Sequence, residues 1–269
     1  MAAIFSERLG AGKAMEYEFI ALEVDQKVAI LRLRRPPRNL LNITMLEEIN
    51  GALLSLRQFP ELEVLVVRGA DGNFCEGIDL KDHRQRRVQR LIQLYTRVFE
   101  LLRMTNVISV AAVQGNAFGG GFELALGCNL IVAAETTTFA LPQIKQGVIP
   151  PMAAAILPRV APRRLAMEWI LMGNSISAVR LAHDGVVNRL FEPENFERRL
   201  GEFVSELTDK SGPVLQLAKR AQMEAYYASF PEAMASIQSL YLRELMALHD
   251  AREGPRAARE EREPVWKNC

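Results

Sequence analysis

Apolar residues along the first part of the chain change their spacing from one element to the next. The apolar runs 19–24 and 28–33 flank a polar turn and predict a β-hairpin. Residues 45–59 carry apolar side chains at helical spacing, and Thr44 is the expected N-cap. The β-branched run 64–67 then predicts a buried strand. Strands that alternate with crossover helices predict an α/β fold with a parallel element in its sheet.

The same alternation continues through the middle of the chain and then gives way to helices. Residues 86–104 have the spacing of a long amphipathic helix, and further strands are expected at 107–113, 129–134, 137–141 and 186–190. From Pro150 onward the spacing is mostly helical. We therefore expect an α/β core over residues 1–200 and a helical C-terminal region over residues 201–269.

The composition narrows the class of function. A chain of 269 residues with 49% hydrophobic positions can bury a full core. Lys and Arg number 33 against 32 Asp and Glu, and a net charge of +1 argues against a general binder of nucleic acid or membrane surfaces. The apolar runs are shorter than the roughly 18 residues that a membrane helix needs. Residues 1–15 lack the apolar stretch of a signal peptide, so we expect a flexible leader on a soluble, cytoplasmic protein.

The sequence offers little for a metal site. Its three cysteines, Cys75, Cys128 and Cys269, lack the spacing of metal ligands, and the first two lie in apolar runs. This pattern predicts reduced thiols rather than a metal centre or disulfides. Only three histidines are present, which argues further against a histidine-based metal site.

Three adjacent glycines, 119–121, stand where a predicted strand runs into a helical segment. Without Cβ atoms a ligand can lie against the backbone, and the free amides at a helix start attract negative charge. Glu123 follows among apolar neighbours. Free amides beside a carboxylate are typical of reactions that pass through an oxyanion and move a proton. The alternative is tight packing of strand on helix, with Glu123 serving only the helix dipole.

Three loops marked by glycine or proline, 74–80, 115–123 and 141–150, each follow a predicted strand. Their order and spacing resemble the crotonase superfamily, also called the enoyl-CoA hydratase/isomerase superfamily. The resemblance covers residues 17–266 and is carried by the segments 35–37, 39–42, 74–80, 115–123, 139–144, 147–150 and 250–254. It implies a spiral of ββα turns, a helical C-terminal region that forms trimers or dimers of trimers, and an acyl-CoA thioester as ligand. Coenzyme A would enter with the substrate, so no separate cofactor is expected.

The resemblance also implies roles for individual residues. The backbone amides of Ile78 and Gly120 would hold the thioester oxygen, and Glu123 matches the first of two catalytic glutamates. The second position is Gln143, which can hold a water but cannot take a proton. Three alternatives follow: Glu123 as the only general acid/base of water addition or removal, another crotonase reaction such as thioester hydrolysis or decarboxylation, or acyl-CoA binding with little turnover. Asp82 and His83 are candidates for a second proton carrier.

Further contacts to the substrate or to coenzyme A are implied for a set of loop residues: Arg38, Leu40, Gly77, Asp79, Leu80, His83, Gly119, Pro142 and Pro150. Asp79 has a structural alternative, in which it fixes its loop by hydrogen bonds. The arginines at 84, 86, 87 and 90 are either a solvated helix face or a patch for the CoA phosphates. The tail carries Ala258 and Glu261, with Arg262 beside them, where the family has a nucleotide contact, so that contact is altered or absent here.

A finer resemblance concerns the acyl group. Segments 36–42, 45–50, 77–83 and 144–151 are similar to those of the cyclic dienoyl-CoA hydratases of anaerobic aromatic degradation. Residues 150–155 replace the glycine-rich segment of straight-chain hydratases with bulkier side chains, which would reshape the acyl pocket for a ring. The resemblance implies a lyase that hydrates or dehydrates an α,β-unsaturated acyl-CoA, although this subfamily carries a glutamate where Gln143 stands.

Overall fold

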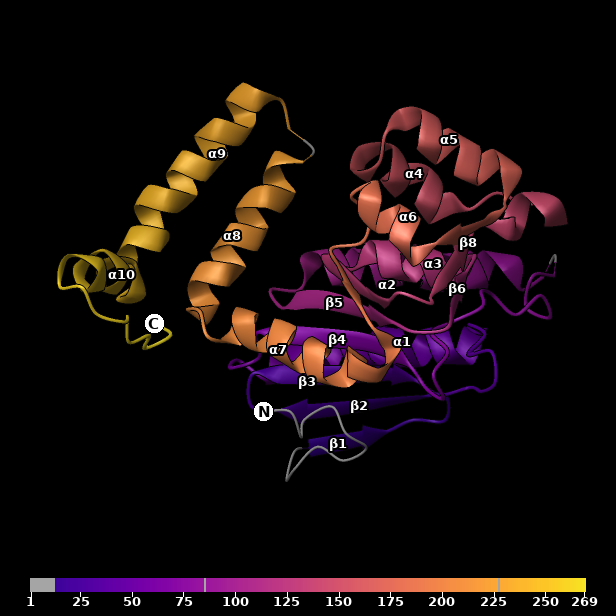
Figure 1. The fold of residues 1–269 in the computed structure, drawn as a ribbon, viewed down its shortest axis with the longest axis horizontal. Coiled ribbons are helices and arrows are strands. Elements are labelled where there is room, and N and C mark those ends of the chain that lie inside the picture. The colour runs from indigo at the N-terminus through magenta and orange to yellow at the C-terminus, as the bar shows by residue number, and fades with distance from the viewer. Residues whose placement is uncertain (1–12, 85, 227) are drawn as a thin grey trace.

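The computed structural model describes residues 13–84, 86–226 and 228–269, and Figure 1 shows how they are arranged. A seven-stranded sheet with the order β1-β2-β3-β4-β5-β7-β10 forms the centre of the fold. Its strands are β1 (Lys13–Glu16), β2 (Ile20–Asp25), β3 (Val28–Leu33), β4 (Val64–Gly69), β5 (Ile108–Val113), β7 (Leu130–Ala134) and β10 (Arg189–Phe191). The first three strands are antiparallel neighbours, and β3 to β10 run parallel. Both the hairpin and the parallel element expected from the sequence are confirmed.

A second, three-stranded sheet gives the chain its spiral form. Its strands are β6 (Asn116–Phe118), β8 (Thr138–Ala140) and β9 (Ser175–Ser177), in the order β6-β8-β9. The chain passes from β5 in the large sheet to β6 in the small sheet and then into a helix, and it repeats this path from β7 to β8. Two single bridges, Leu41 with Ile78 and Cys75 with Ala117, extend the small layer toward the N-terminal turns. The mixed α/β spiral of ββα turns is therefore confirmed.

Helices cover both faces of the large sheet. The main core packs α1 (Ile43–Ser55), α2 (Val88–Met104) and α3 (Gly120–Gly127) against one face, with α4 (Pro151–Val160), α5 (Arg163–Met172) and α6 (Ala178–His183) beyond. On the opposite face a second apolar cluster joins the sheet to α7 (Phe196–Thr208), which lies across the strands in Figure 1. Every residue of β5 is buried, as expected for a strand with apolar layers on both sides.

The last three helices, α8 (Gly212–Ala225), α9 (Phe230–Arg243) and α10 (Asp250–Arg259), extend to one side of this body (Figure 1). The boundary expected between residues 200 and 201 falls inside α7, which belongs to the packing of the sheet. The chain leaves the sheet only after α7, at residues 209–211.

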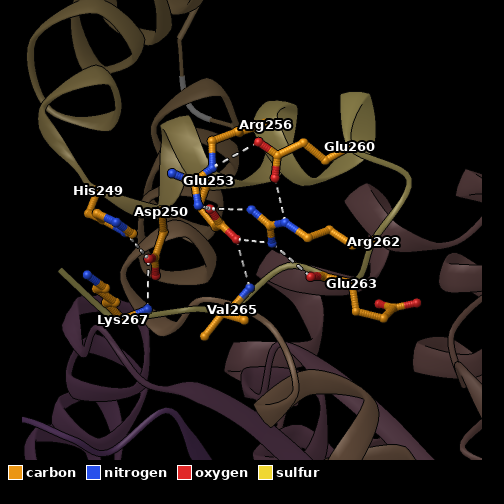
Figure 2. A network of polar contacts seen from close by, with 9 residues as sticks. All are labelled: His249, Asp250, Glu253, Arg256, Glu260, Arg262, Glu263, Val265 and Lys267. Carbon is orange, nitrogen blue, oxygen red and sulfur yellow. Dashed lines mark hydrogen bonds and ion pairs between the residues drawn. The ribbon is translucent and has the colours of Figure 1, made fainter.

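Polar contacts close the C-terminal tail onto α10, as Figure 2 shows. Glu253 is buried and accepts hydrogen bonds from the Arg262 guanidinium at 2.6 Å and the Val265 amide at 3.1 Å. These two donors lower the pKa of Glu253 to about 2. Asp250 accepts hydrogen bonds from the amides of Lys267 and Asn268, both at 2.9 Å. Arg262, the basic residue near the expected nucleotide contact, is thus engaged within its own tail.

Some local predictions were wrong. Helix α1 begins at Ile43, and its N-cap is Asn42 rather than Thr44, because Asn42 Oδ1 accepts the Met45 amide at 2.8 Å. Residues 13–16 form β1 instead of part of a leader, while residues 1–12 lie outside the described residues. The loop expected at 142–145 is a 3₁₀ helix, η3 (Pro142–Gln146). The strands β6 and β9 were not predicted, because β6 lies inside the predicted glycine turn 115–123 and β9 inside the region expected to be mostly helical.

Candidate active site

The three loops singled out in the sequence meet around one cavity of about 80 Å³. Loop 74–80 and the turn 115–123 contribute to its wall, and η3 with the segment that follows it forms another side. The predicted site residues that line it are Gly77, Ile78, Leu80, His83, Gly119, Gly120, Glu123, Pro142 and Gln143. The remaining walls are mainly apolar and include Ile92, Val148 and Ile149.

Backbone hydrogen bonds hold these loops in contact. The Cys75 amide donates to Asn116 O at 3.0 Å, and the Phe118 amide donates to Cys75 O at 2.9 Å. Gly121 makes this approach possible, because a Cβ atom built on it would lie 2.0 Å from the Cys75 carbonyl oxygen. The sequence indicated that this turn needs a residue without a side chain. The structure gives the reason, which is the direct contact between the backbones of Gly121 and Cys75.

The amides of Ile78 and Gly120 are free donors at the cavity. Leu41 bonds to the residues on either side of Ile78, through Gly77 O and the Asp79 amide, so the Ile78 amide points away from this bridge. Gly120 is the first residue of α3, where an amide has no intrahelical acceptor. Among the described residues neither amide donates a hydrogen bond. A Cβ built on Gly77 would lie 3.7 Å from Gly120 N, so the two loops adjoin.

Glu123 is completely buried and accepts four hydrogen bonds. Its Oε1 accepts the Met152 and Ala153 amides at 2.7 and 2.9 Å, at the N-terminus of α4. Its Oε2 accepts from Tyr95 Oη and Gln143 Nε2, each at 3.1 Å. Burial raises the pKa of Glu123 to about 7, and these four donors only partly offset it. A carboxyl with this pKa exchanges its proton near neutral pH, as a general acid/base must.

Gln143 lies directly beside Glu123, at the position where the resemblance places a second glutamate. While Nε2 donates to Glu123, the amide oxygen Oε1 is buried and has no hydrogen-bond partner among the described residues. A buried acceptor without a partner costs free energy, so this atom favours a donor such as a water or a hydroxyl group. The side chain also packs against the glycine turn, because a Cβ on Gly119 would lie 3.4 Å from Gln143 Cδ.

Tyr95 is a site residue that the sequence analysis missed. It lies on α2, is completely buried, and places its hydroxyl 3.1 Å from both Glu123 Oε2 and Gly120 O. Its position in the sequence could have indicated its burial, since Tyr95 shares the inward apolar stripe of the amphipathic helix with Leu91 and Val98. A tyrosine on such a stripe needs a partner for its hydroxyl when it is buried.

Four predicted contact residues lie outside the cavity wall. Asp79 instead fixes its loop: it pairs with Arg35 at 2.7 Å and accepts the Lys81 amide at 3.0 Å. Burial opposes ionisation of Asp79, but these two partners outweigh it and lower its pKa. Arg38 pairs with Glu76 at 2.6 Å. The other two are Leu40, whose carbonyl oxygen accepts from Arg35, and Pro150, which precedes the first turn of α4.

Asp82 is not available as a second proton carrier. Its Oδ2 accepts the Ile43 amide at 2.8 Å, and its Oδ1 pairs with Arg87 at 2.8 Å, so the carboxylate anchors the start of α1. The basic run is also partly engaged, since Arg90 pairs with Glu47 at 2.9 Å. His83 is the one of the two proposed carriers that lines the cavity.

Comparison with known proteins agrees with this arrangement. Residues 23–269 match the family model described as enoyl-CoA hydratase/isomerase. The chain is 30% identical over 255 residues to the probable enoyl-CoA hydratase echA8 of Mycobacterium bovis, covering 94% of this chain and 99% of the relative. It is 32% identical over 248 residues to a carnitinyl-CoA dehydratase of Salmonella heidelberg, covering 88% of this chain and 94% of the relative.

A solved structure from Geobacillus kaustophilus HTA426 shares the fold, with a TM-score of 0.91 at 22% identity over 96% of this chain and all of that one. The fold and the order of the site loops define a crotonase-type protein. The chain belongs to the enoyl-CoA hydratase/isomerase family, within the crotonase superfamily.

Proposed function

We propose that the protein is an acyl-CoA lyase that adds water to, or removes it from, an α,β-unsaturated acyl-CoA. One observation carries the proposal: a buried carboxyl with a pKa of about 7, Glu123, lines the same cavity as the two free amides of Ile78 and Gly120. The names of the relatives, a probable enoyl-CoA hydratase and a carnitinyl-CoA dehydratase, support the same class of reaction.

In the direction of hydration, the thioester oxygen accepts hydrogen bonds from the Ile78 and Gly120 amides. A water donates to Gln143 Oε1 and displaces Gln143 Nε2 from Glu123. Glu123 takes a proton from this water while the oxygen of the water bonds to Cβ of the acyl group. The electron pair of the double bond moves toward the thioester, so that an enolate forms. Each amide stabilises the negative oxygen by roughly 3 kcal/mol. Glu123 then delivers the proton to Cα, so one molecule of water has been added.

A panel of acyl-CoA thioesters, followed by mass spectrometry, tests the proposal. An enoyl-CoA that gains the mass of one water supports it, and the reverse loss from a 3-hydroxyacyl-CoA does so equally. A thiol reagent that detects free coenzyme A separates this outcome from thioester hydrolysis. If the whole panel is bound without any change of mass, the lyase proposal is wrong.

Another crotonase reaction, or acyl-CoA binding with little turnover, is the second candidate. The observation in its favour is the polar contact between Gln143 and Glu123, because the expected second carboxylate is missing and the carboxylate present is fully hydrogen-bonded. Loss of carbon dioxide or of free coenzyme A in the same panel would identify a decarboxylase or a hydrolase. Nucleic acid remains a disfavoured ligand, since the net charge is +1.

The size of the cavity bears on the acyl group. At about 80 Å³ it is smaller than a cavity of about 150 Å³ that holds benzene in another protein. A six-membered ring therefore requires movement of its exposed apolar wall residues, Leu80 and Ile149, which are 58% and 70% exposed. We propose that short straight acyl groups fit the observed cavity and that a cyclic one needs this wall to open.

Replacing Gln143 by glutamate should raise the rate of hydration of straight enoyl-CoAs. The new carboxyl would stand where Gln143 Nε2 now lies 3.1 Å from Glu123 Oε2, and two carboxyls this close share one proton at neutral pH. One then serves as base and the other as acid. Steady-state kinetics over a range of pH should show a higher kcat and a bell-shaped profile. An unchanged rate would mean that the pocket rather than the missing acid limits the chemistry.

We also propose that the chain associates with itself through α9. Apolar side chains are exposed along this helix at Phe230, Met234, Tyr241 and Leu242, with exposures from 47% to 78%. Exposed apolar rows of this kind mark protein interfaces. We assign this row to a second copy of the chain, in line with the self-association that the family resemblance implies. Among the described residues, no helix is both long and apolar enough to cross a membrane.

Light scattering after gel filtration tests this association. We expect the 30.2 kDa chain to run as a trimer, and the double substitution Phe230→Asp with Leu242→Asp to reduce the mass to that of one chain. Ser239→Asp, at an exposed polar position of the same helix outside this apolar row, is the matched control. A wild-type protein that is monomeric at micromolar concentration contradicts the proposal.

A further inference from the structure

The hydroxyl of Tyr95 stands between two acceptors that belong to different parts of the site. One is Glu123 Oε2, the group that exchanges a proton in the proposed reaction, and the other is the carbonyl oxygen of Gly120, each at 3.1 Å. The ring is held in place by burial and by an edge-to-face contact with Phe99, with ring centroids 5.0 Å apart. The hydroxyl can therefore change its acceptor by rotating its proton, without movement of the ring.

The number of protons decides which contacts can form. A phenol hydroxyl has one proton to donate and also accepts, whereas an ionised carboxylate and a carbonyl oxygen only accept. With Glu123 ionised, Tyr95 can serve only one of its two acceptors, and the charged one makes the stronger hydrogen bond. With Glu123 protonated on Oε2, a complete chain forms: Glu123 donates to Tyr95, and Tyr95 donates to Gly120 O.

We propose that Tyr95 is a positioning residue whose hydroxyl changes its hydrogen-bond acceptor with the protonation state of Glu123. In this way Tyr95 couples that state to the first turn of α3, which carries the Gly120 amide of the proposed oxyanion site. This rests on the proposed function, because it takes Glu123 as the group that gains and loses the proton. Each arrival of a proton at Glu123 turns the Tyr95 hydroxyl toward Gly120 O, and each departure turns it back. The ionised and neutral forms of Glu123 thus both have a hydrogen-bonding partner in Tyr95.

The groups around this pair fit the role. Burial, and then the charge of Glu123, raises the pKa of Tyr95 well above its usual value, so the phenol keeps its proton. Cys75, from the neighbouring loop, is also buried, and burial raises its pKa to about 12, so it stays neutral. Glu76 and His83 line the same cavity. The contacts from α4 and η3 are amide groups, which do not titrate.

The test is the variant Tyr95→Phe, which keeps the ring and removes the hydroxyl. Loss of a donor to the ionised form should raise the pKa of Glu123 by about one unit. The acid limb of kcat/KM, measured with the thioester of highest rate, should move to higher pH by the same amount, and kcat should fall more than KM changes. Tyr17→Phe, which removes a hydroxyl at a partly exposed position away from the cavity, should leave the limb where it is.

A second measurement needs no turnover. The carboxyl carbon of Glu123, labelled with ¹³C and assigned by its absence in Glu123→Gln, should titrate at higher pH in Tyr95→Phe. Replacing the five tyrosines by 3-fluorotyrosine, a more acidic donor, should shift this titration the opposite way, and the shift should vanish in the Tyr95→Phe background.

The outcomes separate the two proposals. Equal titration of Glu123 in the wild type and Tyr95→Phe, or a shift to lower pH, overturns the role of Tyr95 and leaves the lyase proposal standing. Full hydration activity of Glu123→Gln overturns the proposed role of Glu123 as acid/base, and a panel of thioesters bound without any change of mass overturns the lyase proposal, whatever Tyr95 does.

Discussion

Replacing Glu123 by glutamine is expected to lower the rate of hydration roughly 10²- to 10⁴-fold, the range typical for loss of a general acid/base. The fold should survive the change. The oxygen of the new glutamine side chain can still accept the Met152 and Ala153 amides. Its NH₂ group can donate to Tyr95 Oη or, after the Gln143 side-chain amide flips, to Gln143 Oε1. Affinity for the acyl-CoA should change little, because the carboxylate acts on the proton rather than on the thioester.

The same substitution should stabilise the protein at alkaline pH. Glu123 has a pKa of 4.5 when unfolded and of about 7 when folded, so its proton is bound more tightly in the folded state. The folded state is therefore favoured most below pH 4.5, and this contribution is lost as pH rises through 7. The loss amounts to about 3 kcal/mol by pH 8. Glu123→Gln has no proton to lose and should show a flatter dependence of unfolding free energy on pH.

Two measurements check this pair of expectations. Steady-state kinetics and acyl-CoA titration give the separate effects on turnover and binding, and urea unfolding at pH 5 and pH 8 gives the effect on stability. Glu168→Gln, at an exposed glutamate of α5, is the matched control and should alter neither quantity. A fully active Glu123→Gln would show that another group performs the proton transfer.

Replacing Gly121 by alanine should damage stability and activity together. The added Cβ would lie 2.0 Å from Cys75 O and 2.7 Å from Cys75 C, both backbone atoms that cannot turn aside. Loop 74–80 and α3 must then move apart, at a cost in unfolding free energy of about 1–3 kcal/mol. The Ile78 and Gly120 amides would lose their relative placement, and a displacement of about 1 Å in a catalytic group lowers rates by about 10²-fold.

A second glycine provides the control for this prediction. Gly51 lies in α1, and a Cβ built on it meets no atom within 4 Å. Gly51→Ala should therefore raise the unfolding free energy by about 0.5–1 kcal/mol, because alanine is the better helix former. The urea midpoint should fall in Gly121→Ala and rise in Gly51→Ala. The value of kcat/KM should fall only in Gly121→Ala. Equal behaviour of the two would mean that the contact with Cys75 does not constrain the site.

The elements that local chemistry determines were accessible from the sequence. The hairpin, the buried strand β5 and the glycine turn each show a clear apolar period or a demand for a missing Cβ. The position of the loops around one cavity was predicted from the resemblance to a family, because the sequence of a single loop does not show which other loop it contacts. The start of α1 was missed by two positions, because Asn42 and Thr44 are both good caps. A distant residue, Asp82, holds the Ile43 amide and favours the earlier start.

The hydrogen-bond partners of Glu123 in the folded protein could not be predicted from the sequence pattern. Its Oε1 contacts come from amides about 30 residues further along, and an amide carries no side-chain signal. Tyr95 reaches it across 28 residues from a helix whose stripe is otherwise ordinary core. Arg38 was expected at the ligand because basic loop residues often bind anions, but Glu76 lies close enough to neutralise it. Such pairings depend on packing and not on sequence spacing.

The contact between Glu123 and the start of α4 has a consequence for how this pocket can diversify. Within the described part of the chain, only the backbone amides of Met152 and Ala153 hold Glu123 Oε1, so the side chain at position 152 can be exchanged without removing a partner of Glu123. Met152 is only partly buried, whereas Ala153 is enclosed. Position 152 is therefore a place where selection, natural or in the laboratory, can alter neighbouring packing while the hydrogen bonds that hold Glu123 stay intact.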